Sequence, residues 1–308
     1  MMTARQRGVQ MSGAAIGMDA GHTCGHRLCG MLSVLLAALP AVVCGGAPAG
    51  PVDPGGVAGF WTREHKAVAL NAGIVGAAAA YGFSTWGWGE SSFATHSEGW
   101  FGADTRSGGA DKLGHAYTAS VATAVGAALY RRWGYAEHDA ARLGAFSGLL
   151  LTTAIEVGDG FSPEHGFSWE DQVANVAGVG FEYLRLRQPA LRQRVQFRWE
   201  YYPSEAVRNG EQTDILTDYS GSRWLFAFPL RAWGANASAL RWIELQAGYG
   251  TRGFASSDRP YFDEAERHPF IGVGIHVPLV AESLGVPRGA RRIFEHIQIP
   301  GTALPLPP

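Results

Sequence analysis

Cysteine is missing from most of the chain, because the three cysteines, Cys24, Cys29 and Cys44, all lie within the first 44 of 308 residues. The rest of the sequence therefore cannot form a disulfide or a cysteine-ligated metal site. The same region contains an apolar run, MLSVLLAALPAVV at 31–43, followed by small residues. That pattern predicts a signal peptide and leader over residues 1–47 and an exported protein.

Charge is also scarce, at 17% of the residues, against about 25% in a typical soluble domain. The formal net charge is −2, so the chain has no basic excess to bind a nucleic-acid backbone, and we expect no nucleic-acid partner. Hydrophobic residues make up 46% of the chain, which allows a buried core and excludes intrinsic disorder. Low charge with 42 glycines and 11% aromatic residues is typical of a bacterial envelope protein. Its expected partners are a membrane surface or other envelope components.

The sequence also lacks the common catalytic fingerprints. No GxSxG, HExxH, Walker or dinucleotide-binding motif occurs in it, so none of these enzyme classes is indicated. A convincing membrane span is missing as well. Residues 67–88 have the length, but alanine and glycine contribute little transfer free energy. We favour a tightly packed soluble or surface-attached bundle, with a membrane bundle as the alternative.

Helical periodicity dominates residues 61–189, which follow a linker rich in proline and glycine at 48–60. The pattern predicts four helices, at 65–83, 111–133, 140–157 and 169–187. Each is rich in alanine and glycine, so neighbouring helix backbones can approach closely.

Beyond residue 190 the apolar period changes to two, which predicts strands at 195–201, 243–249 and 271–279. A fourth strand is expected at 224–233, where Pro229 indicates an edge position. We therefore expect a β-rich region over 190–298, with one sheet face covered, and a tail over 299–308. The predicted fold class is α+β, an Ala/Gly-rich bundle of about four helices packed against a C-terminal antiparallel β-sheet. The alternative is a sheet whose aromatic face meets lipid.

Because charge is scarce in the helical half, its few ionisable residues are informative. Three helices each offer a polar pair: Asp111 with His115, Glu156 with Asp159, and Asp171 with Asn175. Buried carboxylates need a proton, a cation or a hydrogen-bonded partner. Lys112 is expected either to neutralise such a carboxylate or to reach the surface.

Two interpretations of these residues are open. In the first, a divalent metal ion is the cofactor, with Asp111, His115, Glu156, Asp159 and Asp171 as its ligands. An enzyme built on that ion would use His115, Glu156 and Asp171 in catalysis. In the second, the residues are structural: Asp111 offsets a helix dipole, Asp171 caps a helix and Asp159 belongs to a turn. Lys112, Ser168 and Asn175 are then structural polar partners.

Two segments carry a family resemblance: EGWFGADTRSGGADKLGHAYTAS (98–120) and TAIEVGDGFSPEHGFSWEDQVANVAG (153–178). Their pattern D-K-x-x-H, E-x-x-D-G and F-S-x-x-D-x-x-x-N-x-x-G resembles the YfiM-like predicted periplasmic lipoproteins, over roughly 95–280. A looser similarity extends to the VanZ-like membrane proteins. The resemblance implies an envelope location and identifies the polar residues as a unit, but it supplies no reaction.

The sequence thus favours an exported cell-envelope protein of uncharacterised, non-enzymatic function, in the periplasm or associated with the outer membrane. Cys44 is the candidate for lipid anchoring, although Val43 precedes it where a lipobox has a small residue. The alternative is a metal-assisted hydrolase or transferase that acts on envelope lipid or cell-wall material. A third hypothesis is a small-ligand carrier that uses the aromatic sheet face.

Overall fold

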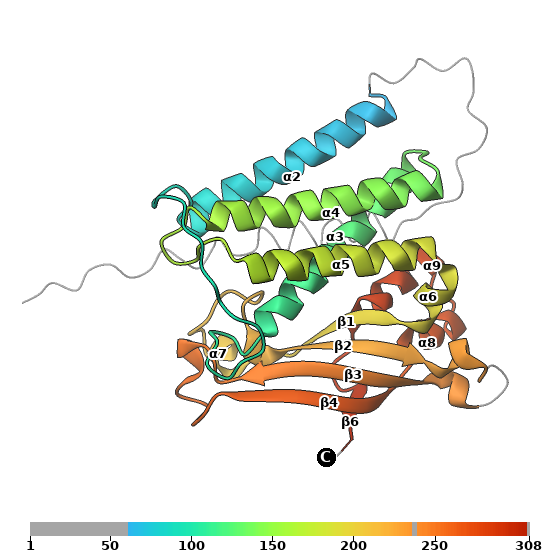
Figure 1. The fold of residues 1–308 in the computed structure, drawn as a ribbon. Coiled ribbons are helices and arrows are strands. Elements are labelled where there is room, and N and C mark those ends of the chain that lie inside the picture. The colour runs from blue at the N-terminus through green and yellow to red at the C-terminus, as the bar shows by residue number, and fades with distance from the viewer. Residues whose placement is uncertain (1–60, 236–238, 307–308) are drawn as a thin grey trace, which may run out of the picture.

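The computed structural model describes residues 61–235 and 239–306, and these residues form two layers (Figure 1). A bundle of long helices lies along one face of a six-stranded sheet, which confirms the predicted α+β class. The expected signal peptide, the linker at 48–60 and the three cysteines lie outside the described residues.

The long helices are α2 (Arg63–Thr85), α3 (Ala110–Arg132), α4 (Glu137–Asp159) and α5 (Trp169–Arg187). Their bounds agree with the four predicted helices to within three residues at each end. Two of them begin at side-chain caps, because Thr62 accepts the His65 N–H and Ser168 accepts the Asp171 N–H. Such caps satisfy backbone donors that have no partner inside the helix.

Small residues allow the helices to pack closely around α3, which contacts both α4 and α5, whereas α2 packs mainly on α4. A β-carbon on Gly178 of α5 would overlap the backbone of Ala116 on α3. A β-carbon on Gly144 of α4 would lie 2.5 Å from the Ala127 nitrogen. Glycine at these positions is therefore required by packing, as the Ala/Gly-rich composition indicated.

The sheet has the strand order β5-β1-β2-β3-β4-β6. Its strands are β1 (Gln196–Tyr201), β2 (Ser222–Pro229), β3 (Ile243–Arg252), β4 (Glu266–Ile275), β5 (Ile297–Gln298) and β6 (Ala303–Pro305). Neighbouring strands pair antiparallel except for β1 and β5, which are parallel. Short helices connect them: α6 (Pro189–Arg194), α7 (Glu205–Arg208), α8 (Val277–Ser283) and α9 (Arg288–Arg291).

Three expectations about this region were wrong. Strand β2 lies between β1 and β3 rather than at an edge, because Pro229 is its last residue and interrupts the ladder only there. The predicted strand at 271–279 ends at Ile275, and Pro278 lies in the first turn of α8, where a missing N–H costs nothing. The expected C-terminal tail contributes the edge strand β6.

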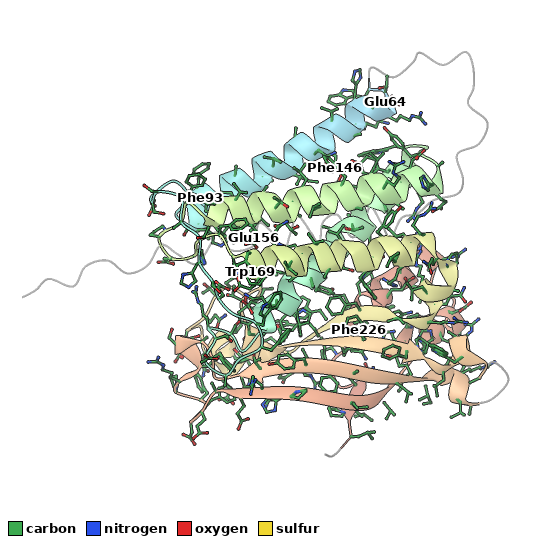
Figure 2. All side chains as sticks on the ribbon, in the orientation of Figure 1. Glu64, Phe93, Phe146, Glu156, Trp169 and Phe226 are labelled. Atoms are coloured by element: carbon green, nitrogen blue, oxygen red, sulfur yellow. The ribbon has the colours of Figure 1, made fainter. Side chains whose placement is uncertain are left out.

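The helices cover only part of one sheet face, because Leu245 of β3 and Ile271 and Ile275 of β4 are 46%, 68% and 49% exposed on that side, whereas the opposite face is buried. On the helix side, Phe197 and Trp224 form a core with α3 and α5, and Figure 2 shows Phe226 on the same face. This packing supports the prediction of a sheet lying on the bundle rather than facing lipid there. On the other face, Arg198 and Glu244 are fully buried and paired at 2.6 Å.

The polar face is buried because the sheet curls. Strands β5 and β6 lie at opposite edges, although only residues 299–302 connect them. In a flat sheet the edge strands would lie about 24 Å apart, while five Cα–Cα steps extend at most about 18 Å. The edges must therefore approach each other, and the side chains of the concave face enclose a polar interior. Gln298 of β5 accepts from Arg198 at 2.7 Å inside it.

The helix layer leaves much apolar surface exposed. The helices α2 and α4 are long and apolar enough, by length and composition, to cross a membrane. Only 11% of the most apolar window of α2 is buried inside the structure. Val68 and Phe83 of α2 and Phe146 of α4 are all more than half exposed.

Candidate functional site

The polar residues singled out from the sequence gather at one end of the bundle. Asp111 and His115 lie in the first turns of α3, and Asp171 and Asn175 lie in those of α5. Glu156 lies in the last turn of α4, which runs the opposite way, and Figure 2 places it beside the start of α5. We call Glu98, Asp111, Lys112, His115, Glu156, Asp171 and Asn175 the acidic cluster.

Local structure places the two Asp residues of the acidic cluster. The chain reaches α3 through Gly108 and Gly109, both with positive φ, at 63° and 87°. A side chain at Gly109 would also collide with Phe101, so only glycine permits this tight entry into the helix. Ser168 ends the preceding loop and caps α5 through the Asp171 N–H at 3.2 Å. Ser168, which was expected as a structural polar partner, therefore caps α5, whereas the Asp171 side chain, which was expected to cap the helix, pairs with Lys112.

Lys112 lies at the centre of the acidic cluster, and only 2% of its side chain is exposed. Its Nζ atom is 2.6 Å from Asp111, 2.8 Å from Asp171 and 3.0 Å from Glu98. Of the two roles considered for Lys112, neutralisation of buried carboxylates is confirmed and extension to the surface is wrong. One ammonium group thus joins α3, α5 and the loop between α2 and α3.

Glu98 was not singled out from the sequence. It lies in the irregular segment between α2 and α3, where no periodicity marks a buried position. Its side chain is 15% exposed and its carboxylate accepts from Lys112. The available signal was its position as the first residue of the 98–120 motif segment.

His115 of α3 links helix α4 to the acidic cluster. Its Nδ1 atom lies 3.1 Å from Glu156 on α4, and its Nε2 atom lies 3.9 Å from Asp171 on α5. The Asn175 amide nitrogen donates to Glu156 at 3.4 Å, while its oxygen is buried without a hydrogen-bond partner. The His115 side chain is 28% exposed, whereas those of Glu156 and Asp171 are 2% and 5% exposed.

Asp159 lies apart from these contacts, although the metal interpretation included it. Its carboxylate accepts the Trp88 indole N–H at 2.8 Å. Among the described residues, the ligand atoms that lie within 4.8 Å of one another come from His115, Glu156 and Asp171, or from Glu98, Asp111 and Asp171. Asp159 therefore belongs to neither set, and its hydrogen bond anchors the loop after α2.

The acidic cluster contains more acidic than basic side chains. Glu98, Asp111, Glu156 and Asp171 face the two cationic groups Lys112 and His115. Burial raises the pKa of Glu156 to about 8 and, with the nearby Asp111 and Asp171, raises that of Glu98 to about 7. Both glutamates therefore bind protons near neutral pH, and the remaining charges balance as two carboxylates against two cations.

The pKa values of Asp111 and His115 shift in the directions that favour their ionised forms. Burial disfavours ionisation of Asp111, but the hydrogen bond with Glu98 and the charge of Lys112 outweigh it and lower its pKa. Burial also disfavours the imidazolium of His115, but the nearby acidic groups, with Asp171 making the largest contribution, outweigh that effect and raise its pKa. The arrangement is chemically able to hold two ion-paired cations and two protonated glutamates without any ligand.

The donor atoms present also fit a divalent cation in one of the two sets. The Glu98, Asp111 and Asp171 oxygens already surround the Lys112 ammonium, which would repel a second cation. His115, Glu156 and Asp171 supply one nitrogen and two oxygens, a combination that Mn²⁺, Fe²⁺ and Zn²⁺ accept. Asn175, whose amide nitrogen contacts Glu156, has a buried oxygen without a hydrogen-bond partner that is a further candidate ligand.

Residues 97–187 match the model of a family described as "Predicted periplasmic lipoprotein (DUF2279)". This segment is similar to that family, which confirms the resemblance of the two motif segments, and the match ends at residue 187 rather than near residue 280. The matched residues include the entire acidic cluster. The description is consistent with an exported protein and with lipid anchoring. Comparison with curated proteins and with solved structures gives no match.

Proposed function

We propose that the chain is a non-enzymatic cell-envelope protein in which the acidic cluster fixes the geometry of the helical bundle. The observation that carries this proposal is the position of the Lys112 ammonium, within 3.0 Å of carboxylates from α3, α5 and the loop before α3. Breaking a buried pair on one side leaves an uncompensated charge, which is strongly destabilising. The contacts of Lys112 therefore select one arrangement of these segments.

His115 extends the same connection to α4 through Glu156. Each helix of the bundle core then contributes at least one polar side chain whose partner is on another helix. Small residues at the helix contacts specify the distance between the helices, but they do not specify the register along the axes, because alanine and glycine offer few distinct shapes. Directional polar contacts supply the register. This division of roles explains why the acidic cluster is buried although small residues make most of the helix contacts around it.

We also propose that the protein associates with a membrane surface. Helix α2 supports this proposal, because only 11% of its most apolar window is buried inside the structure. A large exposed apolar surface on a helix is unfavourable in water and is typical of an interaction site. An attached lipid at Cys44 would place this surface next to a bilayer.

The metal content of the purified full chain tests the non-enzymatic proposal. We expect only substoichiometric Mn, Fe and Zn by mass spectrometry, and no change in melting temperature when EDTA or each of these ions is added. His115→Gln removes one ligand, and His138→Gln is the matched control, since His138 is exposed on α4 and about half of its side chain is accessible. One equivalent of metal that is lost in His115→Gln but kept in His138→Gln would overturn the proposal.

That result would favour the second candidate, a metal-assisted hydrolase or transferase acting on envelope lipid or cell-wall material. The specific observation behind it is the approach of His115, Glu156 and Asp171 ligand atoms to within 4.8 Å of one another. A divalent ion held there would supply Lewis-acid activation of a substrate oxygen or of water. In that case the three residues orient the ion, and the partly exposed His115 marks the side from which substrate enters.

A further inference from the structure

The opposite end of the bundle carries a concentration of arginine. An open groove of ≈ 990 Å³ lies between the C-terminal ends of α3 and α5 and the segment around α8 and α9. Among the described residues that line it, eight are arginines and three are glutamates. We call this feature the arginine groove. In a chain with a formal net charge of −2, this local excess of five positive charges is a distinct property of one surface.

Several of the arginines have internal partners. Glu295 accepts from Arg192 and from Arg185, and Glu282 lies 3.1 Å from Arg291. These pairs hold the groove in shape. Glu282 also pairs with Arg231, and Glu137 pairs with Arg131. The three glutamates that line the groove therefore do not neutralise its eight arginines.

Arg292 is the arginine whose position is hardest to explain without a ligand. It is partly buried, and no ion pair joins it to any residue in the described part of the chain. Burial and the nearby guanidinium groups of Arg192 and Arg131 lower its pKa. A half-buried guanidinium among like charges is unfavourable unless an anion compensates it.

A second, mainly apolar cavity adjoins the arginine groove. This slot of ≈ 70 Å³ lies between α3, α5 and the segment 292–297. Its lining includes Val121, Val125 and Ile293, and it shares Arg131, Arg192 and Arg292 with the groove. Guanidinium groups therefore stand at the boundary between a hydrophobic pocket and an open polar groove.

We propose that the arginine groove binds the phosphate group of an anionic membrane phospholipid, with adjoining methylene groups of the same molecule in the apolar slot. Guanidinium groups bind phosphate through paired, charge-assisted hydrogen bonds. A free phosphate or a nucleotide would use the arginines but leave the apolar slot unfilled, so the pair of cavities fits an amphiphile. The proposal rests on the envelope location but is independent of the role of the acidic cluster.

The position of the arginine groove agrees with this occupant. Arg63 at the start of α2 lies over the Tyr135 ring, 4.8 Å from its centroid, next to the end of α3. The groove and the start of α2 therefore share one end of the bundle. The exposed apolar surface of α2 extends from the same end, so a bilayer that covers α2 presents its headgroups near the arginines.

Vesicle binding by the purified full chain tests the proposal. Binding to phosphatidylcholine vesicles is compared with binding to vesicles that also contain phosphatidylglycerol. The double variant Arg131→Gln/Arg292→Gln removes two charges at the boundary of the slot. Arg252→Gln/Arg259→Gln removes two exposed charges that lie outside both cavities and is the matched control.

We expect phosphatidylglycerol to strengthen binding of the wild type, although the chain has a net negative charge. The groove variant should lose about tenfold or more in affinity for these vesicles, with no change on phosphatidylcholine, while the control keeps its affinity. Ala128→Leu adds bulk to the slot without a change of charge and should also weaken the preference. A short-chain phosphatidylglycerol should compete with the vesicles, and inorganic phosphate at the same concentration should not.

Three results would overturn the proposal. An equal loss of affinity for phosphatidylglycerol vesicles in the groove and control variants would indicate diffuse electrostatic attraction. Equal competition by inorganic phosphate would indicate a phosphate site without lipid specificity. No preference for phosphatidylglycerol in a folded wild type would exclude an anionic lipid. The metal measurements on His115→Gln address the other end of the bundle, so each proposal can fail separately.

Discussion

The two ends of the helical bundle carry opposite charge, and they differ in how much of that charge is paired within the protein. At one end, Lys112 and His115 are surrounded by carboxylates and almost every charged atom has a partner within the protein. At the other end, arginines outnumber glutamates and the space between them is open. Charge enclosed by its own partners fixes structure, whereas unneutralised charge beside an open groove indicates a ligand.

Helix direction contributes to the contrast. Asp111 and Asp171 lie in the first turns of α3 and α5, and Arg131 and Arg185 lie in their last turns. Each position complements the partial charge of the helix terminus. Because α3 and α5 both begin in the acidic cluster and both end at the arginine groove, the two ends acquire opposite sign. Over 23 residues of α3 they are separated by about 34 Å, so their charges act independently.

The largest effect is expected from Lys112→Met, which removes the cation from the acidic cluster. Asp111 and Asp171 would remain buried without their partner, so the free energy of unfolding should fall by about 3–5 kcal/mol. Urea denaturation measures the change. Lys66→Met is the control, because Lys66 is the other lysine of the chain and is exposed on α2; it should change stability by less than about 0.5 kcal/mol. Similar small changes in both variants would show that the cluster is not needed for structure.

Gly178→Ala tests whether close contact of α3 and α5 is needed to assemble the acidic cluster. The new methyl group would overlap the Ala116 backbone, and such overpacking costs about 1–3 kcal/mol. Gly180→Ala in the same helix adds a methyl group where no atom lies within 4 Å. It should leave stability unchanged or raise it by about 0.5–1 kcal/mol through helix propensity. Thermal melts of both variants suffice, and equal destabilisation would contradict the packing described for Gly178.

The pH dependence of stability should reveal the protonated glutamates. The pKa of Glu156 rises from 4.5 to about 8 on folding, so the folded state binds the additional proton between these values. Its contribution is fully present below about pH 5 and is lost as the pH rises to about 8. Glu156→Gln should remove this decline and be more stable than wild type at pH 8, by on the order of 1–3 kcal/mol. The exposed Glu164→Gln should retain the wild-type profile. A Glu156→Gln variant that loses stability at pH 8 would argue for an ionised, cation-bound Glu156.

The smallest effect on stability is expected at the arginine groove. Arg292→Gln removes a partly buried charge from among like charges, so the free energy of unfolding should stay within about 0.5 kcal/mol of wild type or increase slightly. Added salt should stabilise the wild type more than the variant, because it screens the repulsion. Chemical denaturation of the wild type and the variant at two salt concentrations measures the change in stability and its salt dependence. A loss as large as that of Lys112→Met would remove the distinction between the two ends.

Local sequence patterns predicted the helices and most residues of the acidic cluster, but not that Asp159 lies apart from it. Alanine-rich periodicity located the four helices, and the spacing of four between Asp111 and His115 placed both on one helix face, as the structure shows. The sequence did not reveal the role of Glu98, because this residue lies in an irregular segment where no periodicity indicates which side chains are buried. Its pairing with Lys112 depends on the path of the loop between α2 and α3.

Long-range geometry accounts for what the sequence could not reveal about the sheet and the groove. Alternation correctly located four strands, but it could not show that Arg198 and Glu244 would be enclosed, since this requires the sheet to curl and its edges to approach. The arginine groove is equally non-local. Arg131 and Arg292 are 161 positions apart in the chain, and no motif relates them.

The central claim is that the acidic cluster is neutralised from within, by Lys112, His115 and protons on its glutamates. Carbon NMR of the full chain labelled at the glutamate carboxyl carbons tests it most directly, with Glu156→Gln used to assign the signal. We predict that the Glu156 carboxyl titrates near pH 8, the value to which burial raises its pKa. A Glu156 signal that remains ionised down to pH 5 would contradict the claim, because the carboxylate would then be balanced by the His115 imidazolium at 3.1 Å or by a bound metal ion and not by a proton.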